Sequence, residues 1–298
     1  MFSHLPHLGE ILSLLCAIIW ASAVILFKKS GEKVTPLGLN LFKNVLALVL
    51  LVPTSLVLGI TLAPQTSLFD FSLIIVSGIL GIALSDTLFF KSLNLLGAEL
   101  SAIVDCLYSP FIIILSVLFL HENMNGLQIF GVLLIVSAVL TVSRKENRKN
   151  ISRKDLSLGI LFGVLAMALV AVGIVMIKPL LNHTSLIWVV EVRLLAGCLG
   201  LGIFILFHPR RQNIVSSLLS MRNWQYMLPG SFLGAYLSSV IWMGGMKYTQ
   251  ASISSALNQT SNIFISILAA IILKEPVNLL RVIAIILAFV GVVIVSFG

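Results

Sequence analysis

The stretch Arg144–Asp155, RKENRKNISRKD, is the longest polar segment of the chain and lies at its centre. On either side the sequence is almost wholly apolar. Of the 298 residues, 59% are hydrophobic and only 10% are charged, and the mean hydropathy is +1.11. An average soluble domain is roughly 25% charged. The chain therefore has too little charge to cover a soluble core of this size, which excludes an ordinary soluble enzyme.

The apolar residues form ten continuous runs, each near the length of about 17–25 residues that crosses a bilayer. Because they do not alternate as strands do, and a spanning backbone must satisfy its own hydrogen bonds, we predict an all-α membrane protein with ten transmembrane helices. The first run is predicted to be retained, since no Lys or Arg precedes it as in a signal peptide. The predicted spans are 8–28, 36–60, 72–95, 98–119, 127–143, 156–181, 185–207, 226–248, 251–273 and 278–297.

The two sides of the central segment resemble each other. We predict a first five-helix repeat at 1–143, a linker at 144–155 and a second repeat at 156–298. Because five is odd, the repeats must have opposite orientations, and inverted repeats around a midplane site are typical of transporters. The matched pairs are Lys28 with Lys178 and Lys43 with Arg193, 150 positions apart, and Ser101 with Ser254 and Asp105 with Asn258, 153 positions apart.

The segment Ser101–Leu133, SAIVDCLYSPFIIILSVLFLHENMNGLQIFGVL, and its counterpart Ser254–Val282 carry a family resemblance. Each half has a fourth span with a proline or polar kink and ends it near a Glu, Glu122 or Glu275. In this the chain resembles the EamA-type transporters of the drug/metabolite transporter superfamily. Trp20 resembles a tryptophan common in the first span of that family. The resemblance implies transport of a metabolite and leaves the substrate open.

The positive charges are unevenly distributed over the loops. The net charge is +8, and fourteen of the nineteen Lys and Arg residues follow spans 1, 5, 7 and 9, against two on the opposite side. The positive-inside rule therefore puts these odd-numbered loops in the cytoplasm and both termini outside. The family resemblance implies cytoplasmic termini instead, and both orientations stay open. We expect a multi-pass protein of the bacterial inner membrane, in contact with lipid and not with nucleic acid.

Ionisable side chains inside the spans are functional candidates, because each costs about 2.5–3.5 kcal/mol on insertion scales. Other polar residues lie three or four positions from some of these ionisable residues, on the same helix face. Aromatic side chains that could contact a substrate lie in the same spans. Pro110 within the fourth span is expected to free a carbonyl and kink the helix. The substrate-binding or coupling residues that we predict are Trp20, Lys43, Asp86, Phe89, Asp105, Tyr108, Glu191, Arg193, Tyr236, Trp242, Asn258 and Asn262.

A clamp between helices is the alternative role for each ion: Asp86 or Asp105 could pair with Lys43, and Glu191 with an arginine of another helix. The five charges sum to two positive and three negative, so one acid is left without a partner. An unpartnered buried acid tends to be protonated or to bind a cation. Asp86 or Asp105 is thus our candidate for proton coupling or amine binding.

The leading function is a secondary active transporter of a small polar or amphipathic metabolite, with an amino-acid-like solute favoured because the interior carries both signs of charge. Proton coupling, import or export, and monomer or homodimer stay open. We predict no enzyme activity, metal or cofactor, since no nucleophile–base, metal-ligand or ATPase motif is recognisable. The alternative is a non-transporting membrane protein that binds lipid or senses a ligand.

Overall fold

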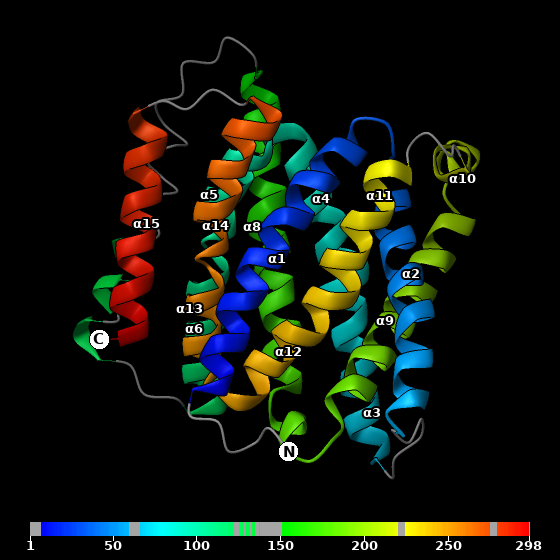
Figure 1. Cartoon of the computed structure of the whole chain (residues 1–298), viewed down its shortest axis with the longest axis horizontal. Coiled ribbons are helices and arrows are strands. Elements are labelled where there is room, and N and C mark those ends of the chain that lie inside the picture. Colours follow the sequence, from blue (N-terminus) through cyan, green and yellow to red (C-terminus); the bar gives the residue numbers. More distant parts are fainter. Residues whose placement is uncertain are drawn as a thin grey trace.

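The computed structural model describes residues 7–59, 66–121, 125–127, 129–131, 133–134, 137, 151–219, 224–274 and 279–297, and all the regular structure within them is helical (Figure 1). The first half contains α1 (Leu8–Gly31), α2 (Pro36–Val57), α3 (Leu68–Gly78), η1 (Ile79–Ser85), α4 (Asp86–Leu96), α5 (Ala98–Asp105) and α6 (Tyr108–Leu120). The second contains α8 (Arg153–Ile177), η2 (Pro179–Asn182), α9 (Leu186–Leu206), α10 (Arg211–Leu219), α11 (Trp224–Ser231), η4 (Phe232–Leu237), α12 (Ser238–Tyr248), α13 (Ala251–Asn258), α14 (Ser261–Leu268), η5 (Ala269–Leu273) and α15 (Leu279–Phe297).

Several helices begin at side-chain caps that the sequence supplies. The Thr35 hydroxyl accepts a hydrogen bond from the Gly38 N–H, with Pro36 in the first helical position of α2. Ser152 caps α8 by accepting from the Asp155 N–H at 3.0 Å, and its own hydroxyl donates to the Asp155 carboxylate at 2.6 Å. The cap formed by Ser152 and Asp155 therefore determines where α8, the first helix of the second half, begins.

Six of the helical segments in the described ranges are long and apolar enough to cross a membrane. They are Leu8–Gly31, Pro36–Val57, Leu68–Leu96, Leu100–Leu120, Arg153–Ile177 and Leu186–Leu206. The third begins at Leu68 rather than at residue 72 as predicted, because Ser67 accepts a cap hydrogen bond from the Asp70 N–H and adds a turn. Most of the predicted span 127–143 lies outside the described residues.

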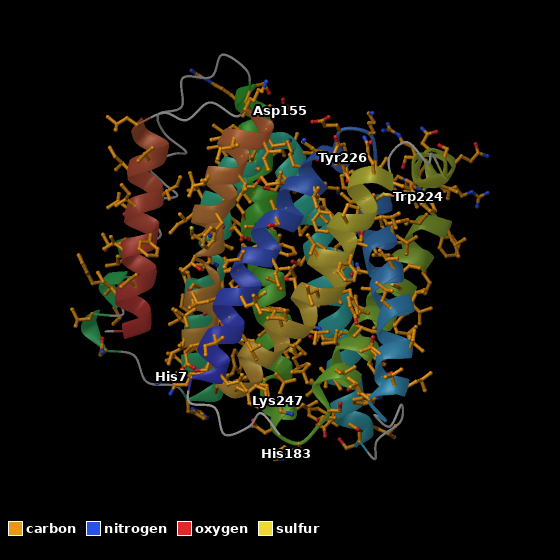
Figure 2. All side chains as sticks on the ribbon, in the orientation of Figure 1. His7, Asp155, His183, Trp224, Tyr226 and Lys247 are labelled. Atoms are coloured by element: carbon orange, nitrogen blue, oxygen red, sulfur yellow. The ribbon has the colours of Figure 1, made fainter. Side chains whose placement is uncertain are left out.

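The first helices of the two halves run in opposite directions. His7, before α1, lies at the lower end of the molecule, whereas Asp155, in the first turn of α8, lies at the upper end (Figure 2). α1 packs along α12 of the second half, and α8 packs along α4 of the first half. Each half thus contributes one helix to each of two tightly packed pairs.

Glycines allow the close approach within these pairs. A Cβ on Gly159 of α8 would lie 2.6 Å from the Leu96 side chain of α4, and one on Gly245 of α12 would lie 2.5 Å from the Ser13 hydroxyl of α1. The small-residue pattern that begins at Gly159 also contacts the first half, where its carbonyl accepts a 2.8 Å hydrogen bond from the Ser92 hydroxyl. Small residues let helix backbones approach closely without bulky side chains between them.

The third span of each half contains a π-helical segment, η1 or η4, and the fourth is broken, between α5 and α6 or between α13 and α14. These irregularities recur 153 positions apart: η1 begins at Ile79 and η4 at Phe232, while α5 ends at Asp105 and α13 at Asn258. π-Segments occur frequently at functional sites, and irregular backbone at membrane depth is tolerated where it lines a cavity.

The first break fits the kink expected from Pro110. Proline cannot donate a hydrogen bond to the Cys106 carbonyl four residues earlier, and the chain makes a tighter turn at Cys106 and Leu107, whose N–H groups bond three residues back. The second break has no proline at the corresponding position, which is Ile263.

Candidate functional site

A cavity of about 140 Å³ lies where the four irregular segments meet. Gly81, Ile82 and Ser85 of η1 line it on one side, and Gly234 of η4 lines it from the second half. The two broken helices supply Asp105 and Tyr108 from the first half, and Asn258, Gln259 and Ser261 from the second. The cavity is therefore built by matched parts of both halves.

Nine of the twelve predicted site residues line this cavity, although they come from eight different helices. They are Trp20, Lys43, Asp86, Phe89, Asp105, Tyr108, Arg193, Trp242 and Asn258.

Lys43 pairs with Asp86, one of the two carboxylates considered from the sequence. The distance from Lys43 Nζ to Asp86 Oδ2 is 2.6 Å, and Lys43 is only 4% exposed. Lys43 also donates to Asn44 Oδ1 at 3.2 Å, and Asn44 donates to Asn40 Oδ1 at 2.7 Å. These contacts hold the Lys43–Asp86 ion pair in place at one wall of the cavity.

Asn40 connects the same network to the π-segment. Its amide donates to the Ile82 carbonyl at 2.7 Å and to the Thr87 hydroxyl at 3.0 Å. A π-segment disrupts the ordinary pattern of helical hydrogen bonds. Asn40 supplies a donor at that point, so the irregular wall of the cavity is held by a buried side chain of α2.

Arg193 is the second cation at the cavity and differs from Lys43 in its surroundings. It is 3% exposed, its guanidinium carbon lies 5.9 Å from the centre of the Trp242 ring, and its Nη1 lacks a hydrogen-bond partner within the described ranges. Nor does any described carboxylate form an ion pair with it, since Asp86 pairs with Lys43. A buried guanidinium without an ion-pair contact is costly, so this position favours an anionic ligand group.

Asp105 presents the opposite sign at the end of α5. Its backbone carbonyl accepts a 3.1 Å hydrogen bond from Gln259 Nε2 of the second half, but its carboxylate has no ion-pair partner in the part of the chain described. The repeat-related residue is the neutral Asn258, whose Oδ1 is buried and likewise lacks a partner there. Among the described residues, the cavity thus has one guanidinium and one carboxyl group without an ion-pair partner, and one amide oxygen without a hydrogen-bond partner.

Aromatic rings complete the walls. Trp20 lies against Phe89 with ring centres 5.8 Å apart, and Tyr108 lies against Trp242 at 6.4 Å. Phe89 and Trp242 occupy repeat-related positions, 153 residues apart. These rings can contact the apolar part of a ligand or the face of a cation.

Three predicted site residues lie outside this cavity. Glu191 is buried in α9, two positions from Arg193, where side chains of one helix diverge. The Tyr236 hydroxyl is within 2.9 Å of the Thr54 hydroxyl of α2 and takes part in packing between the halves. Asn262 lines a separate cavity of about 10 Å³ and donates to Cys106 Sγ at 3.2 Å.

Other lining residues were missed from the sequence because serine, cysteine and glycine are common in packed helices. They include Cys16, whose Sγ lies 3.3 Å from the Ser238 hydroxyl, and Ser239, which replaces Asp86 in the second half. The offset of 153 would have found part of this set, since Gly81 matches Gly234. Among the described residues, no three His, Cys, Asp or Glu side chains cluster as metal ligands.

Comparison with known proteins agrees with this architecture. The sequence model of the EamA-like transporter family matches the chain twice, over residues 7–144 and 157–297. No match is found among curated proteins. A solved structure described as "Crystal structure of protein" superposes with a TM-score of 0.75, at 16% identity, over 97% of this chain and 96% of its own. That identity shows a shared fold alone. The two family matches cover nearly the whole sequence, and the chain therefore belongs to the EamA-like transporter family.

Proposed function

We propose that this protein is a secondary active transporter that moves a small zwitterionic, amino-acid-like metabolite across the membrane by alternating access. The observation that carries the proposal is that Arg193 and Asp105, which can carry opposite charges, line one cavity between two related halves and have no ion-pair partner among the described residues. Since one water molecule requires about 10–15 Å³ of cavity volume, a cavity of about 140 Å³ has space for roughly ten water molecules. That size suits a solute with about as many heavy atoms.

Comparison of the two halves supports Arg193 as the residue that binds the carboxylate of the solute. Lys43 and Arg193 are repeat-related, and in the first half the cation is neutralised by Asp86. In the second half Ser239 stands in the place of that carboxylate. We therefore assign the carboxylate of the solute to Arg193, whose planar guanidinium can bind both carboxylate oxygens.

The ammonium group of the solute is assigned to Asp105. Asn258, its repeat-related partner, offers an amide oxygen to the same cavity and can accept a second hydrogen bond from an ammonium. An acid that must lose a proton before it binds an ammonium would also couple flux to the proton gradient. Measuring flux with and without a pH gradient tests this coupling.

We further propose that ten spans form two inverted five-helix repeats, 1–143 and 156–298, joined by the linker 144–155. The antiparallel directions of α1 and α8 support this arrangement (Figure 1). The excess of basic loops favours a cytoplasmic location for the end of the molecule that carries Asp155. A reporter fused to the C-terminus tests the orientation: activity only as a cytoplasmic reporter rejects it.

The transport proposal is tested by counterflow of amino acids in proteoliposomes. We expect Arg193→Gln and Asp105→Asn to reduce flux at least tenfold, whereas Arg211→Gln and Asp70→Asn, which change charges outside the cavity, retain it. Arg193→Lys should recover part of the flux, since it restores charge without the fork. Saturable binding with no counterflow of any solute would instead favour a sensor. Normal flux in both cavity variants would reject the assigned residues.

A further inference from the structure

Lys28, in the last turn of α1, reaches across to the end of α4. Its Nζ donates hydrogen bonds to the Leu93 carbonyl at 3.0 Å and to the Asn94 carbonyl at 3.3 Å. The last carbonyls of a helix lack partners within the helix and carry its negative dipole end. A lysine at this place therefore fastens the end of α1 to the end of α4.

Lys178, which follows α8, makes the equivalent contact in the second half. Its Nζ donates to the Met246 carbonyl, and to the Thr249 carbonyl at 2.7 Å, at the end of α12. Lys28 and Lys178 are 150 positions apart, and Leu93 and Met246 are 153 apart. The two contacts are thus one device that occurs once in each repeat.

The two contacts lie at opposite ends of the molecule. Lys247, beside the carbonyls that bind Lys178, is at the lower end in Figure 2. Tyr226 is at the upper end, and its ring lies 5.1 Å from Nζ of Lys29, the neighbour of Lys28. The cavity lies between them, and α1, α4, α8 and α12 all contribute to its walls.

These lysines connect helices that are otherwise held mainly to other partners. The extensive, glycine-mediated packing joins α1 to α12 and α4 to α8, whereas α8 and α12 share few contacts. The four helices thus form two pairs that can each move as a unit. Lys28 fastens the pairs to each other at the upper end, and Lys178 fastens them at the lower end.

We propose that Lys28 and Lys178 are matched latches that close the two ends of the transport cavity. Release of Lys28 lets α1 separate from α4 and opens the upper end, and release of Lys178 opens the lower end. Both are fastened in this structure. Rocking of one helix pair against the other, with one latch open at a time, gives alternating access. The inference rests on the proposed transport function.

Cys16 provides a native reporter, because its buried thiol lines the cavity. In a Cys106→Ala/Cys198→Ala background, a membrane-impermeant thiol reagent is applied to either side of vesicles of known orientation. We expect Lys28→Met to raise Cys16 labelling on the order of tenfold from one side only, and Lys178→Met to raise it from the other. Lys28→Arg should keep labelling low, since it retains a donor. Lys33→Met, which removes an exposed charge between α1 and α2, should also leave labelling unchanged.

Equal labelling from both sides in the lysine variants, or no increase in either, would overturn the proposal. This result does not depend on finding the solute, so failure to detect transport leaves the test of the latches intact.

If either lysine variant fails to fold, a second experiment keeps both lysines and locks the upper end with a disulfide. A Cβ on Gly31 would lie 3.1 Å from Asn94 Cγ, so a Gly31→Cys/Asn94→Cys disulfide is within reach. Oxidation should block flux and upper-side labelling and spare lower-side labelling, and reduction should reverse this. Unimpaired upper-side labelling in the oxidised protein would contradict the latch.

Discussion

Asp86→Asn tests whether the ion pair at the cavity wall is needed for folding. The substitution keeps the shape of the side chain and removes the charge that neutralises Lys43. The ammonium group, now 2.6 Å from a carboxylate oxygen, would be left with neutral acceptors alone, the new amide oxygen at position 86 and Asn44 Oδ1 at 3.2 Å. The Lys43 side chain is only 6% exposed, so water compensates poorly for the lost anion.

The burial of the ion pair determines how much stability the Asp86→Asn substitution should cost. Removing one partner of a buried ion pair costs about 3–5 kcal/mol. The Asp86 side chain is 21% exposed at the cavity, so we expect a value near the lower limit, about 3 kcal/mol. At roughly 2 °C per kcal/mol for a large domain, the Tm should fall by about 6 °C. Lys43→Met should also lower the Tm, but the double variant, which removes both charges of the pair, should regain most of the loss.

Thermal unfolding of the four purified proteins in one detergent provides the measurement, with Asp70→Asn as a control acid at the start of α3. The coupling between the two substitutions should be about 2–3 kcal/mol. Effects that add within about 0.5 kcal/mol would refute the reasoning, because residues that do not interact behave in that way.

Three further changes probe the frame around the cavity through the Tm. Gly163→Ala should lower the Tm by the equivalent of about 1–3 kcal/mol, because a Cβ there would lie 2.6 Å from a neighbouring side chain. Gly202→Ala, where a Cβ would meet nothing within 4 Å, should leave the Tm unchanged or raise it. Equal effects of the two substitutions would contradict the packing argument. Asn40→Leu should cost about 1–3 kcal/mol by leaving the Ile82 carbonyl without its donor, and a neutral result would show that η1 does not depend on it. Ser152→Ala should cost about 1 kcal/mol by removing the cap of α8, and no change would exclude that role.

The irregular helices show where prediction from the sequence succeeded and failed. Pro110 marks the first break, because proline has a local effect that can be read from its position. The matching break before Ser261 has no proline. There Gln259 donates to the Asp105 carbonyl of the other half, and Asn262 donates to Gln259 Oε1. Such a break depends on contacts between distant segments, which no local pattern reveals.

The cost of burial selects candidate site residues from the sequence, but their neighbours in the fold decide which of them line the cavity. The rule that ionisable groups inside spans are functional candidates found Lys43, Asp86, Asp105 and Arg193, all of which line the cavity. It also selected Glu191, which is buried outside it. Periodicity places Glu191 and Arg193 on different faces of α9, but it does not say which face meets the cavity.

The duplicated frame and the unequal charges have different consequences for the proposed transport. Matched π-segments, matched breaks and matched lysine contacts give the two halves the same mechanical parts, so the frame can favour either of two related states. The charges do not follow this symmetry, since Asp86 is replaced by Ser239 and Asp105 by Asn258 in the second half. A zwitterion held by Arg193 and Asp105 would therefore keep a single orientation while the frame around it changed direction. If both halves carried the same charges, the zwitterion could bind in two opposite orientations, and neither orientation would be preferred.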